Sequence, residues 1–206
     1  HYMGEKGRFI VFEGIDGSGK TTQIRLLAEH LKKAGRKVHI TAEPTTSVSG
    51  GLLRDALCGA RKRSPGELAA LFLLDRINHN VCPVNGIEKL TSDGYDVICD
   101  RYYYSSLAYQ GSQTNYRWVA DMNLNCPEIR KPDICIFLDL DAKTAAKRIA
   151  SDRAVTEVFE KEQTLETVRR RYLEVFASLP EDNVKIIDAS GDVDEVAKLV
   201  AEQVTG

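Results

Sequence analysis

The chain has 206 residues, of which 43% are hydrophobic and 28% charged, enough to bury an ordinary core without disulfide or metal support. Its 28 basic and 30 acidic residues leave a formal net charge of −2, which argues against general electrostatic binding to DNA, RNA or an anionic membrane. Its five cysteines form no C-x-x-C pair and no apolar run approaches 18 residues, so we expect a cytoplasmic protein without a secretion signal or membrane span.

Five short apolar runs recur along the chain, with room for a helix between them. They lie at 9–12, 38–40, 97–99, 134–138 and 184–187. Runs this short and continuous are typical of parallel strands buried on both faces. Residues 1–3 look like an expression remnant and a start methionine. We therefore expect residues 4–206 to form a single α/β domain, a five-stranded parallel sheet flanked by helices in three layers.

The segments between these runs have helical periodicity. An apolar stripe begins at Ile24 and ends before Gly35, a typical helix stop. Ser64 and Pro65 predict the start of a second, long helix, which Pro83 should break.

The strongest local motif, G-x-x-x-x-G-K-[ST], occurs at residues 14–21 between a predicted strand and a predicted helix. Its glycines let backbone N–H groups point at phosphate oxygens, the Lys20 ammonium reaches the β and γ phosphates, and the Thr21 hydroxyl can ligate Mg²⁺. The motif predicts a P-loop NTPase fold that binds ATP. The expected nucleotide-binding residues are Gly14, Ile15, Asp16, Gly17, Ser18, Gly19, Lys20, Thr21 and Thr22.

Asp100 ends the third apolar run and should therefore emerge at the carboxyl edge of the sheet, beside the phosphate loop. A carboxylate there can hold Mg²⁺ together with Thr21, although a strand-ending Asp is also a common turn residue.

Other P-loop classes fit the sequence less well. A GTPase should carry an N-K-x-D guanine-binding motif, which this sequence lacks. A motor or partition ATPase would need a larger chain or a second signature lysine. A regulatory nucleotide-binding module remains an alternative, distinguished by hydrolysis that requires no acceptor.

Several motifs in their order along the chain resemble those of thymidylate kinases. They are the run 9–22, Glu43-Pro44, the segments 71–76 and 100–110, Lys131-Pro132-Asp133, Phe159-Glu160 and the segment 168–173. The resemblance covers nearly the whole chain and implies ATP-dependent phosphorylation of dTMP to dTDP. Another nucleoside monophosphate kinase of the same fold is the nearest alternative.

The resemblance also implies an acceptor site. Phe72 and Arg76, four residues apart on a predicted helix, share a face suited to stacking on a pyrimidine and donating to its O4. Arg101 is expected to bind the acceptor phosphate, and Tyr109 to select deoxyribose. Asp16 resembles the acidic residue that contacts the acceptor sugar and orients metal-bound water, and the resemblance implies that Asp16 is catalytic together with Lys20, Arg101 and Arg153. The remaining expected acceptor residues are Glu43, Pro44, Ser105, Ser106 and Gln110.

A lid at about 147–160 is expected to complete the positive field around the phosphates. The phosphate loop contains no arginine, so the sequence resembles family members that carry arginines in the lid. We expect Arg153 to be the catalytic lid cation and Arg148 to contact ATP. The three arginines 169–171 look like a mostly solvated helix face.

One departure from the family concerns the arginine that many relatives carry next to Glu43-Pro44, where this chain has Ala42 and Thr45. Arg54, or the hydroxyls of Thr45, Thr46 and Ser47, could replace it. A homodimer is carried over from the family, and the apolar stretch 68–74 is compatible with it.

Overall fold

The computed structural model describes residues 4–59, 61–150 and 155–206, with side chains described again from Lys161. Five parallel strands form one sheet in the order β2-β3-β1-β4-β5. Their bounds are β1 Phe9–Glu13, β2 Lys37–Ala42, β3 Tyr95–Asp100, β4 Ile134–Asp139 and β5 Val184–Asp188. The α/β fold with a five-stranded parallel sheet is thus confirmed.

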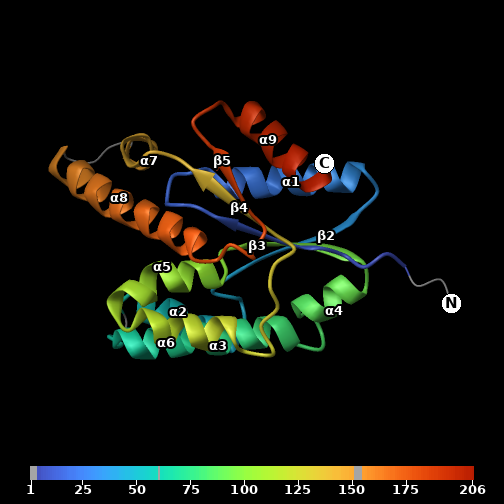
Figure 1. Cartoon of the computed structure of the whole chain (residues 1–206), viewed down its shortest axis with the longest axis horizontal. Helices are drawn as coiled ribbons and strands as arrows, with labels where there is room; N and C mark the ends of the chain where they lie inside the picture. The colour runs from blue at the N-terminus through green and yellow to red at the C-terminus, as the bar shows by residue number, and fades with distance from the viewer. Residues whose placement is uncertain (1–3, 60, 151–154) are drawn as a thin grey trace.

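Helices cover both faces of this sheet (Figure 1). Helices α1 (Lys20–Lys33) and α9 (Val193–Thr205) lie on one side, and α5 (Tyr103–Gln113) lies on the other with the layer of α2 (Val48–Leu57), α3 (Pro65–Val81) and α6 (Tyr116–Leu124). The short α4 (Ile87–Ser92) precedes β3, and α7 (Ala142–Ile149) is followed by the long α8 (Val155–Ala177). Within the described residues, none of these helices is both long enough and apolar enough to cross a membrane.

The three inner strands β3, β1 and β4 are buried, as their apolar runs predict. The edge strands β2 and β5 differ from expectation because they are not buried on both faces: Ile40 is 48% and Ile186 54% exposed. Each has a neighbour on one side only, so part of its apolar surface faces solvent.

The helix limits follow the local signals. Helix α1 ends where Gly35 adopts a positive φ of 83°, a conformation that glycine adopts without steric cost. Ser64 and Glu67 form a capping box at the start of α3, and the predicted break at Pro83 separates α3 from α4.

Parallel pairing brings acidic strand ends to one edge of the sheet. Phe12 pairs in register with Asp100, and Asp139 with Asp188, while Glu13 ends β1 between them. This carboxyl edge is where open α/β sheets bind ligands, so the active site is expected there.

Candidate active site

The phosphate loop joins β1 to α1 and leaves a cavity of about 300 Å³ lined by residues 15–22. Gly17 and Gly19 have φ of 83° and 93°, conformations that let the loop turn tightly around this space. A Cβ at Gly17 would lie 2.7 Å from the Ala145 carbonyl oxygen, so a side chain there would displace α7. The loop is therefore built to wrap an anion at the N-terminus of α1.

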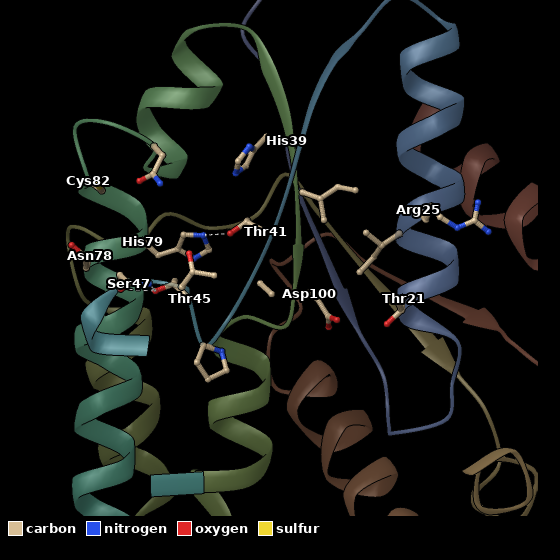
Figure 2. A pocket seen from close by; sticks show the side chains of 16 residues that line it. Thr21, Arg25, His39, Thr41, Thr45, Ser47, Asn78, His79, Cys82 and Asp100 are labelled. Carbon is tan, nitrogen blue, oxygen red and sulfur yellow. Dashed lines mark hydrogen bonds between the residues drawn. The ribbon is translucent and has the colours of Figure 1, made fainter. Parts of the chain in front are cut away.

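Lys20 and Asp100 meet beside this loop. The Lys20 ammonium donates to Asp100 Oδ1 at 2.8 Å, and the two side chains are 10% and 28% exposed. Thr21 and Asp100 line the same cavity of about 750 Å³, which lies between α1 and α3 beside strand β2 (Figure 2). The hydroxyl and carboxylate are oxygen donors of the kind that Mg²⁺ prefers, so these residues fit a magnesium site.

Arg101 follows Asp100 and adopts a backbone φ of 71°, the one positive φ of a non-glycine residue within the described ranges. This left-handed conformation costs roughly 1–3 kcal/mol and persists only where the surroundings impose it. Its Nη2 donates to Asp16 Oδ1 at 3.1 Å and its Nη1 to the Tyr172 hydroxyl at 3.0 Å. The guanidinium carbon also lies 5.8 Å from the centre of the Tyr109 ring. The arginine is thus directed toward the mouth of the phosphate loop.

Glu13, the last residue of β1, is fully buried beside the start of α5. Its Oε1 accepts the backbone N–H groups of Tyr102 at 2.8 Å and Ser105 at 3.2 Å. Its Oε2 accepts the hydroxyls of Ser105 at 2.7 Å and Tyr172 at 2.9 Å. Burial raises the pKa of Glu13 above its ordinary value, and the positive charge of Arg101 and these hydrogen bonds counteract that rise.

A second buried charge cluster lies on α3. The Arg76 side chain is 1% exposed, and its Nε donates to Glu43 Oε1 at 2.8 Å. Its Nη1 donates to Ser106 Oγ at 3.0 Å and to Asn123 Oδ1 at 2.5 Å. Glu43 Oε2 lies 2.8 Å from His79 Nδ1. Among the hydrogen bonds of the described residues, none uses Arg76 Nη2.

A family model for thymidylate kinase matches residues 12–200. The chain belongs to the thymidylate kinase family. A protein of Pyrococcus horikoshii described as "Probable thymidylate kinase" is 37% identical over 201 residues, covering 93% of this chain and 92% of that protein. Proteins with the same description from Methanocaldococcus jannaschii and Methanothermobacter thermautotrophicus are 38% and 40% identical, over 88% and 81% of this chain and 87% and 80% of theirs. Family membership confirms the resemblance and the expected class of enzyme.

The structure brings most of the residues implied by the thymidylate kinase resemblance to one region. Asp16 and Arg101 are in contact, and Ser105, Ser106, Tyr109 and Gln110 follow on α5. Phe72 lies one helical turn before Arg76 on α3 and is half-buried. Pro44 lines the larger cavity, whereas Glu43 does not and is buried against Arg76 and His79. Their roles toward substrate remain proposals.

Four residues are possible replacements for the arginine that many relatives carry next to Glu43-Pro44, and the contacts of the loop after β2 distinguish them. Arg54 Nη1 donates to the Thr45 carbonyl oxygen. The Thr45 and Ser47 hydroxyls donate to Asp75, which is 1% exposed. Of the four candidates, Thr46 is exposed and has no hydrogen bond to another described residue. Its hydroxyl is therefore the one least engaged by the protein.

The lid side is described in part. Arg148 Nη2 donates to the Ala189 carbonyl oxygen at 3.4 Å, in the loop after β5. Arg153, the expected catalytic lid cation, lies outside the described residues. The expectation that residues 169–171 are mostly solvated is wrong for Arg169, which forms two hydrogen bonds with Asp139 at 2.7 and 3.1 Å. This pair joins α8 to the end of β4.

Four residues of this region have no role in the prediction from sequence, although Glu13, Asp75 and Tyr172 lie within the motifs that carry the resemblance. Lys161 on α8 lies 3.4 Å from Asp16 Oδ2 and adds a cation opposite the phosphate loop. Glu13 accepts the backbone N–H of Tyr102, and Asp75 accepts that of Thr45. The Tyr172 hydroxyl accepts a hydrogen bond from the Arg101 side chain. The available signal was a single charge at the end of an apolar run, Glu13 after Phe12 and Asp75 after Leu74.

Proposed function

We propose that this protein transfers the γ-phosphoryl group of ATP to dTMP, forming dTDP and ADP, with Lys20 and Arg101 as the principal catalytic side chains. The observation that carries the proposal is the contact of Arg101 with Asp16 at the mouth of a complete phosphate loop, in a chain of the thymidylate kinase family. In this proposal Arg101 binds the acceptor phosphate, which faces the γ-phosphate of ATP.

In this reaction a phosphate oxygen of dTMP attacks the γ-phosphorus, and the bond from that phosphorus to the β,γ-bridging oxygen breaks. The attacking group is a phosphate monoester, largely ionised near neutral pH, so a strong general base is not required. The protein aligns the two phosphates and places cations where negative charge accumulates. Lys20 leaves Asp100 to bind the β and γ phosphates, while Arg101 holds the acceptor phosphate.

Mg²⁺ would be held by Thr21 and Asp100, and when bound it neutralises charge on the transferred group. Loss of the Lys20–Asp100 contact on ATP binding leaves the Asp100 carboxylate available for this role. In this proposal residues 14–22 and Arg148 form the ATP side of the site. Arg153 is the lid cation, and Lys161, 3.4 Å from Asp16, is a second cation on that side.

Thymine recognition is assigned to α3 and α5. Arg76 is oriented by Glu43, Ser106 and Asn123, which leaves Nη2 for a base oxygen. Phe72, four residues before Arg76 on α3, supplies a stacking surface for the base. Gln110 and Ser105 add polar side chains from α5. We propose that Tyr109 contacts the sugar and excludes a ribose 2′-hydroxyl, which its position beside Arg101 supports.

A homodimer that associates through the layer of α2, α3 and α6 is part of the proposal. Large apolar side chains in this layer are exposed, including Leu57 at 54%, Leu74 at 52% and Trp118 at 45%. We expect sedimentation equilibrium to give twice the chain mass, and Leu74→Glu to shift the distribution to the monomer.

A cytoplasmic location is also proposed, since all five cysteines are unpaired.

An acceptor panel with Mg·ATP tests the proposed activity. In a coupled ADP-release assay we expect strong turnover of dTMP, weaker turnover of dUMP and negligible turnover of UMP and thymidine. Preference for another monophosphate would overturn the thymine assignment. ATP hydrolysis indifferent to every acceptor would favour a regulatory ATPase instead.

A further inference from the structure

Two consecutive residues of β1 accept the backbone N–H groups of Arg101 and Tyr102, the two residues that join β3 to α5. The Phe12 carbonyl oxygen accepts the Arg101 N–H at 2.9 Å, and Glu13 Oε1 accepts the Tyr102 N–H at 2.8 Å. Glu13 Oε1 also accepts the Ser105 N–H in the first turn of α5. The Ser105 N–H is shared between Glu13 and the Tyr102 carbonyl oxygen, which lies 3.0 Å away. A carboxylate at the start of a helix is favourable because it accepts N–H groups there and interacts with the positive end of the helix dipole.

The other oxygen of Glu13 faces the groups that contact the guanidinium. Ser105 and Tyr172 each place a hydroxyl next to Glu13 Oε2, and Arg101 Nη1 lies 3.4 Å from Ser105 Oγ and 3.0 Å from the Tyr172 hydroxyl oxygen. Each hydroxyl has one proton. When these protons point to the carboxylate, the lone pairs of both oxygens face Arg101 and can accept its N–H.

We propose that Glu13 is a positioning residue that sets the orientation of Arg101 through Ser105, Tyr172 and the start of α5. The proposal rests on the role given to Arg101 in the proposed function. Glu13 is fully buried and does not reach the substrate, so it acts only through its neighbours. It also explains why Arg101 keeps its left-handed backbone, since β1 holds the N–H groups on both sides of that turn.

Glu13→Gln tests this relay with little change in shape. The amide oxygen can still accept the backbone N–H groups, but the amide N–H₂ then donates to the two hydroxyls. Ser105 Oγ and the Tyr172 hydroxyl oxygen lie 2.9 Å apart, so one proton can pass between them while the other turns toward Arg101. We expect kcat/KM for dTMP to fall about 10- to 100-fold, because small displacements of an aligning group cost rates of this order. The KM for ATP should stay within about twofold, since the phosphate loop is unchanged.

A double variant separates positioning from general structural damage. If Glu13 acts through Arg101, Glu13→Gln should have no further effect on kcat/KM once Arg101 is alanine, measured as labelled dTDP formed at high enzyme concentration. A full additional loss in the Arg101→Ala background would overturn the proposal, and so would wild-type activity of Glu13→Gln. If Glu13→Gln does not fold, as judged by circular dichroism, Tyr172→Phe replaces it in the same cycle and should show a smaller loss that also vanishes. Wild-type activity of Tyr172→Phe would then overturn the proposal.

These outcomes are distinct from failure of the proposed function. That failure appears in the wild-type chain, as absence of dTMP turnover in the acceptor panel. The positioning role fails only in the variants, while the wild-type enzyme phosphorylates dTMP.

Discussion

Replacement of Arg101 by alanine is expected to lower kcat/KM for dTMP by about a thousandfold or more, the range found when a charge-stabilising arginine is removed from a phosphoryl-transfer site. The guanidinium is anchored by Tyr172 and Asp16 on opposite sides, so a bound phosphate meets a preorganised donor. Nearby tyrosine and carboxylate groups raise the pKa of Arg101 despite its burial, so it remains charged at every working pH. Steady-state kinetics with dTMP and ATP varied separately measure the effect.

The expected loss falls on the acceptor, and the ATP dissociation constant should change little because Lys20 and the loop glycines are untouched. Arg170→Ala is the matched control, since Arg170 is an exposed arginine on α8, the helix that carries Tyr172. It should retain wild-type kinetics. A loss below tenfold in Arg101→Ala would remove Arg101 from the catalytic assignment.

Arg76→Ala is expected to lower the free energy of unfolding by about 3–5 kcal/mol, the usual cost of breaking a buried ion pair from one side. The Glu43 carboxylate, 2% exposed, would be left without its guanidinium partner, and Ser106 and Asn123 would each lose a hydrogen bond. Folded Arg76→Ala protein should also bind dTMP more weakly, because the proposed contact between Arg76 and the base is lost. Urea unfolding followed by circular dichroism gives the stability change.

Two controls test the electrostatic origin of that loss. Glu43→Gln with Arg76→Met removes both charges together, and we expect it to be less destabilised than Arg76→Ala alone. Arg25→Ala removes an exposed partner of Glu29 and should cost less than about 1 kcal/mol. Equal losses in Arg76→Ala and the double variant would mean that packing, rather than an unpaired charge, sets the cost.

The sequence by itself determined the strands, the phosphate loop and the position of Asp100. These features depend on short-range patterns: an apolar run of four or five residues, a glycine motif between strand and helix, and a carboxylate at a strand end. The capping box at Ser64 and the stop at Gly35 are equally local. Such signals survive without knowledge of the strand order.

The tertiary structure decided which strands lie at the edges and which charges meet. Ile40 and Ile186 are exposed because β2 and β5 end the sheet, a property of strand order that their sequences do not encode. Glu13 accepts N–H groups 89 and 92 residues away and a hydroxyl 159 residues away. A buried carboxylate needs hydrogen-bond donors, and only the packing of β1 against α5 and α8 shows which residues supply them.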